Sequence, residues 1–380
     1  MDFSLSEEQV MLQDSVDKYV RENCDVDRHR ALNGSDRGFA ADAWQQFAAL
    51  GWLSVPFAEE VGGFGGGAVD VMVVCEALGK GLVREPYLST VITCGGFLNR
   101  ASTEQQSQWL PGIIDGSKCW AFAFAESSSG YDLSAVETTA VADGDQFTIN
   151  GDKLAVLDGD NADYLVVTAR TSGDACSRDG ISLFIVDTSA EGVERQSFSR
   201  VDGGRGAHIS FNNVSVNTAG LIGPQDGAYA LIESVMDEAI VAMGAEALGS
   251  MQVLLDTTVE YTKTRKQFGQ PIGKFQALQH RMAEMYLRLE ETRSLLFNAA
   301  IQLDANSDES AAACAALKVK VAEAGRYISQ QAVQLHGGIG MTDELVVGHH
   351  FKRLMVLGML YGDEDYYLQR YVDLTRSKAG

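Results

Sequence analysis

The sequence after Gly223 and Pro224 keeps a helical hydrophobic period through three long segments, and this feature limits the possible folds most strongly. The three apolar stripes comprise Leu231, Val235, Ala239, Met243, Ala247, Met251 and Leu255; then Leu278, Met282, Met285, Leu289, Leu296 and Leu303; then Leu317, Val321, Ala324, Ile328 and Leu335. Gly337 and Gly338 close the third stripe, as glycine commonly does at helix ends. We therefore predict a C-terminal antiparallel helix bundle over residues 225–380, with the stripes as core and oligomer contacts.

Two segments with other sequence patterns precede the bundle. Residues 1–117 read as helical, and Ser4 with Glu7 or Ser6 with Gln9 offers a capping box before the first amphipathic run. From residue 118 to 224 the pattern changes to that of strands: "VADGDQFTING" has the DG chemistry of a hairpin turn, "DYLVVTAR" and "GISLFIVDT" are β-branched runs, and "HISFNNVSV" alternates. We predict an N-terminal α domain followed by a middle β domain.

Composition excludes several classes of function. The chain has 380 residues, 46% of them hydrophobic, and a formal net charge of -22, which repels nucleic-acid phosphates and anionic lipid surfaces. The start "MDFSLSEEQV" lacks a basic and an apolar leader region, and no stretch reaches the roughly 18 apolar residues of a membrane span. We expect a cytoplasmic protein.

The six cysteines form no CxxC pair, so neither a disulfide framework nor a metal site is indicated.

One glycine-rich stretch resembles a nucleotide motif without its context. "GGFGGGA" contains Gly63-x-Gly65-x-x-Ala68, which formally matches a dinucleotide fingerprint. It follows the helical pattern "WQQFAALGWLSV" instead of a strand, so the strand-turn-helix unit is missing. We interpret it as a loop that lets the first helices turn.

Four stretches resemble one family when taken together in order. They are "GWLSVPFAEEVGGFGG" (51–66), "FAFAESSSGYD" (122–132), "RKQFGQPIGKFQALQ" (265–279) and "QLHGGIGM" (334–341), and with this spacing the chain resembles the acyl-CoA dehydrogenase family over nearly its whole length. The resemblance implies an N-terminal α-helical domain, a β-barrel-like middle domain and a C-terminal bundle, with FAD held where the β domain meets the C-terminal helices of two subunits. It also implies an acyl-CoA substrate and an electron acceptor such as an electron-transfer flavoprotein.

The family's reaction needs a carboxylate base. A glutamate removes the α-proton of the acyl-CoA while the β-hydrogen leaves as hydride to flavin N5, and hydrogen bonds to the thioester oxygen stabilise the developing enolate. In this chain Gly362 occupies the glutamate's place in the "YEGT" pattern. The alternative place used by some members, on the first helix of the C-terminal domain, is Ala239. The neighbouring carboxylates Glu238, Asp363 and Glu364 are the remaining candidates for a base.

The residues that the resemblance places beside the flavin also depart from the family. Ala125, which follows Phe124, replaces a threonine whose hydroxyl faces the flavin pyrimidine. Ala155 replaces a tryptophan that packs beside the isoalloxazine ring, and Leu157 replaces a residue whose hydroxyl forms a hydrogen bond with flavin N5. Glu126 and Asp132 are retained, and we expect them to serve mainly in loop structure.

The segment that the family presents to the neighbouring subunit's FAD is intact. Arg265 matches the arginine that pairs with the pyrophosphate, a charge match that a guanidinium makes well. The other matched positions on this side are Gln267, Phe268, Gln276, Gln334, Gly337 and Gly338. The two glycines match a stretch where backbone approaches the ADP portion closely, and they also suit a plain helix end.

A hetero-oligomer accounts for this combination. Several bacterial members of the family form α2β2 tetramers in which one subunit type brings the base and the flavin loop, and the other brings the ADP-binding arm. This chain resembles the second type, with the "GDED" run (362–365) as an exposed helix start. Two alternatives remain: an autonomous homotetramer whose base has moved to Glu238, Asp363 or Glu364, and a non-catalytic scaffold of the same fold.

Overall fold

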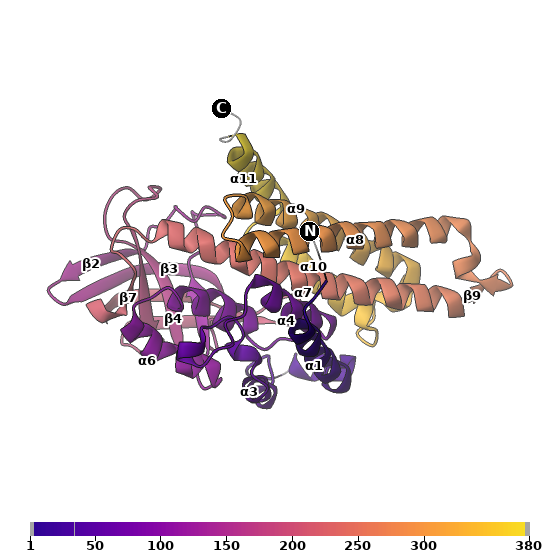
Figure 1. The fold of residues 1–380 in the computed structure, drawn as a ribbon, viewed down its shortest axis with the longest axis horizontal. Helices are drawn as coiled ribbons and strands as arrows, with labels where there is room; N and C mark the ends of the chain where they lie inside the picture. Colours follow the sequence, from indigo (N-terminus) through magenta and orange to yellow (C-terminus); the bar gives the residue numbers. More distant parts are fainter. Residues whose placement is uncertain (1–3, 34, 377–380) are drawn as a thin grey trace. The chain divides into compact units, whose positions relative to one another are not determined.

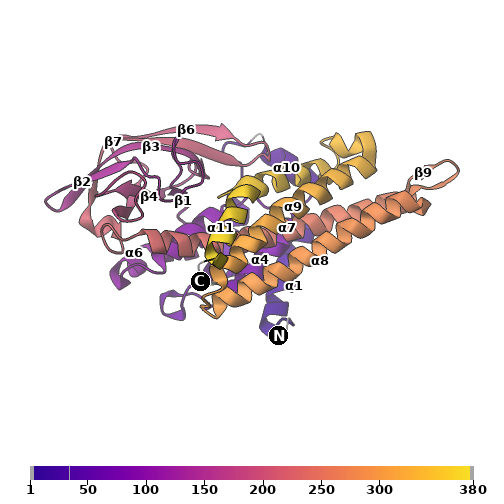
Figure 2. The same ribbon diagram turned by 90° about the horizontal axis from the view of Figure 1, so that it is seen from above.

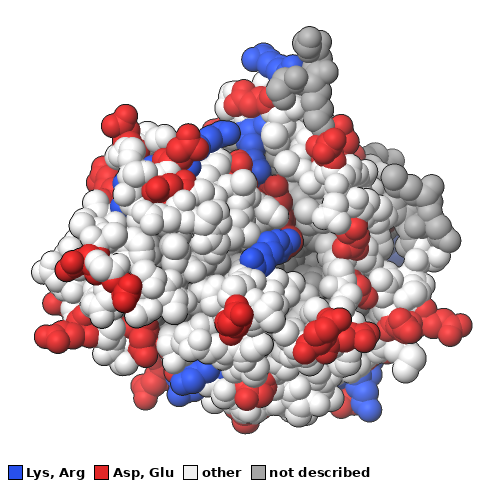
Figure 3. Space-filling view, turned by 60° about the vertical axis from the view of Figure 1, so that its left-hand side comes forward, with Lys and Arg blue, Asp and Glu red and all other residues white. Residues whose placement is uncertain are grey.

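The computed structural model describes residues 4–33 and 35–376, which form two compact units. We call the unit of residues 1–34, 67–83 and 240–380 the helical unit, and the unit of residues 35–66 and 84–239 the sheet unit. Helix α7, Tyr229–Thr264, crosses the boundary between them along the chain. Acidic side chains predominate over basic ones on the face drawn in Figure 3, as the net charge of -22 requires.

The helical unit contains the predicted bundle. Its elements are α1 (Glu7–Asn23), α2 (Val26–Leu32), α4 (Ala68–Lys80), α8 (Gln276–Asp304), α9 (Ser310–His336), α10 (Val346–Met359), α11 (Glu364–Arg376) and the distal part of α7. Helix α9 packs against α8, α10 and α11 (Figure 2). The central stripe residues Met251, Leu289 and Ile328 have no solvent exposure, which confirms the predicted core.

The first helix begins where its cap predicts. The capping box forms at Ser6 and Gln9: the Gln9 N–H donates to Ser6 Oγ at 3.2 Å, and the Ser6 N–H donates to Gln9 Oε1 at 3.0 Å. Helix α1 therefore starts at Glu7, and the alternative box at Ser4 is not the one that closes it.

The sheet unit carries the predicted strands. Its elements are α3 (Ala41–Ala49), a π-helix (Tyr87–Cys94), α5 (Gly95–Leu98), α6 (Thr103–Ile114), β1 (Trp120–Ala123), β2 (Thr139–Asp143), β3 (Gln146–Leu157), β4 (Tyr164–Arg170), β5 (Ile181–Asp187), β6 (Val193–Ser199), β7 (Arg205–Asn217) and β8 (Leu221–Ile222). The strand order is β6-β7-β3-β2-β4-β5-β8, and β1 pairs with β4. Figure 1 labels β2, β3, β4 and β7 of this sheet. Apolar residues such as Ile149, Leu165, Phe184 and Val214 form its core.

Local turn chemistry explains the central hairpin. The hairpin predicted from the DG pair is present: strands β2 and β3 pair antiparallel with Asp143 opposite Gln146, so Gly144 and Asp145 are its loop residues. Gly144 has a φ of +59°, a conformation that glycine adopts without steric cost. The glycine-rich stretch before α4 is a loop, as interpreted, because only 3-10 turns at Trp52–Ser54 and Glu59–Val61 precede it.

Helix α7 differs from the sequence expectation in one respect. Within the described residues it is the one helix long and apolar enough to cross a membrane, although we expected no such segment. The most apolar window of α7 is 78% buried inside the protein. The apolar surface of α7 is thus used for packing, as in the core helix of a globular protein.

Candidate functional site

Position 362, where the resemblance predicts the base, has no room for a side chain. Gly362 has a φ of +136°, which L side chains rarely adopt, and it is buried. A Cβ atom at this position would overlap Cε2 of Tyr367 and lie 2.9 Å from Cδ1 of Tyr366. Tyr367 is 2% exposed, so its ring cannot move aside without disturbing the core. The glycine is therefore required by the local structure.

The acids after Gly362 form a helix start, as expected. Asp363 accepts a hydrogen bond from the Tyr366 N–H at 2.9 Å, which is the geometry of an N-terminal cap. Glu364 pairs with Arg326 of α9 at 2.8 Å. Asp365 is exposed in the first turn of α11, where the helix dipole favours negative charge.

Ala239, the second position at which the resemblance predicts a base, and its neighbour Glu238 lie on α7. Ala239 has no solvent exposure and carries no titratable group. Glu238 accepts hydrogen bonds from both terminal nitrogens of Arg100, one of them at 3.3 Å. Since a guanidinium holds both carboxylate oxygens, Glu238 is engaged in a structural ion pair.

The predicted flavin-side residues of the sheet unit lie just after β1 and at the C-terminal end of β3. The Leu154 N–H donates to the Ala125 carbonyl at 2.8 Å, next to Phe124. Ala155 lies in a β-bulge with a φ of +50°, and its N–H donates to His208 Nδ1 at 3.2 Å. Leu157 is 7% exposed, on the strand opposite Gly206.

Glu126 and Asp132 have structural partners, as expected. Glu126 accepts from the Glu137 N–H at 2.7 Å and from Lys153 Nζ at 2.6 Å. Burial lowers the pKa of Lys153 to about 8, although the negative charge of Glu126 acts to raise it. Burial alone would raise the pKa of Glu126, but Lys153 and the backbone donors hold it below its usual value. Asp132 accepts from Ser134 in a tight turn.

A hairpin projects from the helical unit beyond the ends of α7 and α8 (Figures 1 and 2). We call residues 265–275 the basic hairpin; it contains β9 (Lys266–Gln267) and β10 (Gln270–Pro271), which pair antiparallel. Phe268 at its turn is 92% exposed with a φ of +52°, and Gln276 begins α8 directly after it. The exposed aromatic ring is available for contact with another molecule.

Among the described residues, the charges on this hairpin have no internal partners. No Asp or Glu occurs between Glu260 and Glu284. Arg265 is exposed, and within the described part of the chain neither Arg265, Lys266 nor Lys274 has a side-chain partner. Unpaired cations in a protein with a net charge of -22 mark a place suited to an external anion.

The end of α9 lies beside the base of this hairpin. His336 stacks on Tyr261 of α7 with ring centroids 4.4 Å apart, and the Tyr261 hydroxyl donates to the His336 carbonyl at 3.4 Å. The Nε2 atom of His336 is buried without a partner in the described residues. Gln334, Gly337 and Gly338 are exposed, and a Cβ on either glycine would meet open space.

These two sets of residues differ in their fit to FAD. The basic hairpin, the orphaned His336 nitrogen and the open glycines fit the anionic ADP part of the cofactor. On the flavin side, Ala125, Ala155 and Leu157 offer no hydroxyl or indole, and position 362 holds no carboxylate. The residues present thus fit the ADP part of the cofactor, and the flavin side lacks the hydroxyl, indole and carboxylate that the resemblance implies.

Sequence reasoning missed the side chains that surround Gly362 and Glu238. The rings of Tyr366 and Tyr367 were visible only as neighbours of the acidic run. Arg100 lies 138 positions from Glu238 along the chain, and no local pattern connects them. The absence of acids between Glu260 and Glu284 was a readable signal for the unpaired cations.

A buried lysine of α9, which sequence analysis also missed, contacts the C-terminal end of α10. Lys318 Nζ is fully buried and donates to the carbonyls of Leu357 and Gly358, at 2.5 and 3.2 Å. Burial lowers the pKa of Lys318 to about 7, and the charge of Asp363 opposes that shift. The ammonium thus closes the C-terminus of α10 just before Gly362.

Three domain models of one protein family match this chain in sequence order. Residues 6–117 match the acyl-CoA dehydrogenase N-terminal domain, residues 121–214 the middle domain and residues 225–371 the C-terminal domain. The probable acyl-CoA dehydrogenase YngJ of Bacillus subtilis is 30% identical over 366 residues, covering 94% of this chain and 96% of YngJ. The short-chain specific acyl-CoA dehydrogenase of Clostridium acetobutylicum is 30% identical, covering 91% of this chain and 92% of its own.

Solved structures show the same architecture. A chain of the ChsE4-ChsE5 complex from Mycobacterium tuberculosis matches with a TM-score of 0.90 and 28% identity over 99% of both chains. A variant of the Tcur3481-Tcur3483 steroid ACAD gives 0.90 and 29% over 99% of both chains. The FAD complex of PigA gives 0.92 and 27% over 100% of both chains. This chain belongs to the acyl-CoA dehydrogenase family.

Proposed function

We propose that this chain is a subunit of an FAD-dependent acyl-CoA dehydrogenase, which supplies the ADP-side contacts to FAD held by a partner subunit that carries the base. One observation carries the proposal: the same chain keeps unpaired cations on the basic hairpin and has no space for a side chain at position 362. In an α2β2 tetramer, this arrangement provides two active sites instead of four. An electron-transfer flavoprotein would take up the electrons.

The chain's own residues would bind and position the cofactor. Arg265 pairs with the pyrophosphate, since a guanidinium matches two phosphate oxygens at once. The backbone at Gly337 and Gly338 admits the ADP portion closely, because neither residue has a Cβ. Gln267, Phe268, Gln276 and Gln334 surround the same portion. When bound, FAD accepts the hydride that leaves the β-carbon of the acyl-CoA thioester.

Two similar structures support a hetero-oligomer. ChsE4-ChsE5 is described as a complex, and the steroid ACAD carries the two names Tcur3481 and Tcur3483. Each has a chain that this protein matches over 99% of both lengths. The PigA structure, which contains FAD, supports the cofactor.

Co-expression tests the proposal. The chain is purified alone and after co-expression with each other acyl-CoA dehydrogenase of its own genome, and flavin absorbance and acyl-CoA-dependent dye reduction are measured. We expect a flavin-poor, inactive protein from the chain alone and a yellow, active complex with one of the others. A yellow, active homotetramer of this chain alone would contradict the proposal and favour the autonomous enzyme.

A further inference from the structure

Three histidines meet in the helical unit where helix α2 contacts the start of α10. The rings of His29 on α2 and His349 on α10 have centroids 4.6 Å apart and are tilted by 59°. His350 follows directly on α10, and all three side chains are buried. We call these three residues the histidine cluster. None of them belongs to the base or cofactor positions described above.

The hydrogen bonds of the cluster are those of neutral rings. Nε2 of His349 donates to the Asp343 carbonyl at 3.0 Å, because a carbonyl oxygen can only accept. Neither ring nitrogen of His350 has a partner among the described residues. Burial lowers the pKa of His350 to about 3, and the neighbouring His349 adds to this shift. His350 is therefore neutral in the folded chain at neutral pH.

Protonation would place like charges in a buried contact. The first proton is best tolerated on His29, because it lies in the last turn of α2, where the helix dipole favours a cation. A second proton on His349 would then meet a like charge 4.6 Å away, at the N-terminal end of α10, where the dipole disfavours a cation. At acidic pH, a conformation in which α2 has left α10 therefore binds more protons than the closed one.

The charged groups around the start of α10 are engaged elsewhere. Lys352 lies 3.9 Å from Asp343 of the preceding loop, and Nε and Nη2 of Arg353 bind the carboxylate of Glu246 on α7 at 2.6 and 2.9 Å. Glu344 of the same loop is exposed, where an ion pair with an imidazolium would be worth little. Among the described residues, these acids offer the cluster no buried counter-ion.

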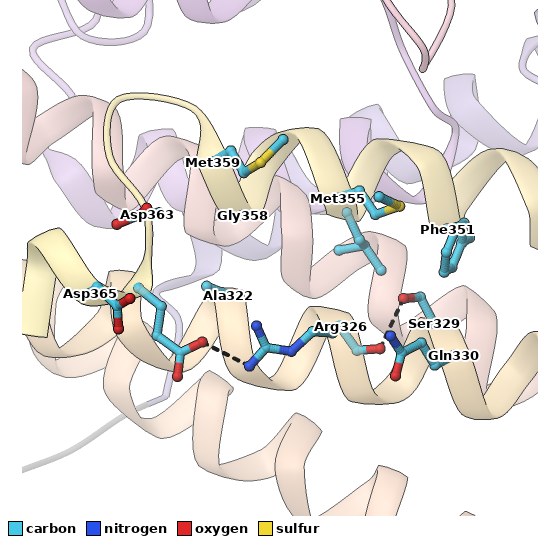
Figure 4. A pocket seen from close by; sticks show the side chains of 12 residues that line it. Ala322, Arg326, Ser329, Gln330, Phe351, Met355, Gly358, Met359, Asp363 and Asp365 are labelled. Carbon is cyan, nitrogen blue, oxygen red and sulfur yellow. Dashed lines mark hydrogen bonds and ion pairs between the residues drawn. The ribbon is translucent and has the colours of Figure 1, made fainter. Parts of the chain in front are cut away.

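The charges on α2 and α9 are also engaged. On α2, Arg30 pairs with Asp27 at 3.4 Å, and Asp25 accepts from the Arg28 N–H at 2.8 Å. Lys318 of α9 bonds carbonyls at the opposite, C-terminal end of α10. The remaining charged side chains of α9 have partners on other helices: Lys320 with Glu291, Glu323 with Arg288, and Arg326 with Glu364. Figure 4 shows the last pair as a dashed line from Arg326.

We propose that the histidine cluster is a pH-sensitive latch, which holds α2 on α10 while its rings are neutral and releases α2 when the rings take up protons. Helix α10 stays in place, because it packs on α9 and Arg353 ties it to Glu246 of α7. Helix α2 has only seven residues, too few to keep a helix without support. Release should therefore unfold α2 locally while the bundle remains folded.

Hydrogen exchange of the full chain tests the latch. Amide exchange is followed by mass spectrometry at about pH 7.5 and about pH 5, on either side of the range in which imidazole titrates, with labelling times scaled to equal intrinsic exchange. We expect the amides of α2 to lose protection at least about tenfold at the lower pH, and those of α9 to keep theirs.

Two variants should remove the effect by different routes. His349→Gln keeps an N–H donor for the Asp343 carbonyl but does not titrate in this range. His29→Phe keeps a ring against His349 but carries no proton. In both variants α2 should stay equally protected at the two pH values. His280→Gln, at an exposed histidine of α8, is the matched control and should lose protection of α2 as the parent does.

Three outcomes would overturn the inference. Equal protection of α2 at the two pH values in the parent would show that the cluster does not respond to protons. An acid-induced loss of the parent's size in His349→Gln and His29→Phe would assign the effect to other groups. A parallel loss in α2 and α9 would show that acid unfolds the whole bundle. Because the two variants act independently, either one that folds at the higher pH is enough to decide.

Discussion

The ring of Tyr367 fills the space into which a side chain at Gly362 would project. Both residues are buried, and Gly362 has a φ of +136°. The glycine at the position where the resemblance predicts the base is therefore part of the packing around the start of α11. A carboxylate could not be introduced there by substitution alone.

Changing Gly362 to Glu should destabilise the chain without creating a base. Overpacking against Tyr367 and the unfavourable φ should together cost about 2 to 4 kcal/mol of unfolding free energy. Urea denaturation of Gly362→Glu measures the cost. Gly338→Ala serves as the control, because its Cβ meets open space. A stable Gly362→Glu protein with the parent's unfolding free energy would show that the tyrosines rearrange easily.

Changing Arg265 to Ala should deplete FAD from the assembled complex. Removing one member of a buried charge pair typically costs about 2 to 5 kcal/mol, which lowers cofactor affinity by more than tenfold. The measurement is FAD content after gel filtration. Arg281→Ala is the control, since Arg281 is also exposed near the hairpin but already bonds Gln331 at 2.9 Å. Full FAD occupancy in Arg265→Ala would place the cofactor elsewhere.

Neutralising the candidate acids should leave α-proton abstraction nearly unchanged. Asp363→Asn, Glu364→Gln, Asp365→Asn and Glu238→Gln are tested by single-turnover flavin bleaching with acyl-CoA in the assembled complex. Substitutions outside the chemistry usually change free energies by about 0.5 kcal/mol or less, so each variant should bleach within a few-fold of the parent. Loss of a true base costs roughly 100-fold or more. A collapse in one variant would identify that residue as the base.

Local patterns allowed much of the fold to be predicted. The Ser6 and Gln9 cap, the Gly144 turn and the helical stripes each depend on residues close in sequence, and each is found in the structure. The acidic run proved to be a helix start for the same reason, because Asp363 caps a residue three positions later. Such contacts are set by propensity and hydrogen bonding within one or two turns.

Long-range packing limited what could be predicted at the site. The resemblance located Gly362, but the overlap with Tyr367 depends on how α11 leaves the preceding loop. The guanidinium that holds Glu238 comes from Arg100, far away in sequence. The burial of Lys318 depends on the packing of α9 against α10. These relationships arise from tertiary packing, which overrides the local pattern.

The buried Lys318 should make stability depend on pH in the neutral to alkaline range. Its pKa is about 7 in the folded chain and about 10.4 when unfolded, so between these values the unfolded state binds more protons. The contribution of Lys318 to the unfolding free energy should therefore increase as the pH rises from about 7 to about 10.

Urea denaturation of the parent and Lys318→Met at pH 7 and pH 9.5 isolates this contribution from those of other groups. The parent should gain stability relative to Lys318→Met at the higher pH. The same difference at both pH values would mean that Lys318 stays protonated in the folded chain. Lys266→Met, at an exposed lysine, should show no change in the difference between the two pH values.

Native mass spectrometry of the co-expressed complex counts chains and cofactors in one particle. We expect two copies of this chain, two copies of the partner and two FAD molecules, with no FAD retained by this chain alone. A homotetramer of this chain with four FAD molecules would contradict this expectation, since each copy would then hold a complete cofactor site.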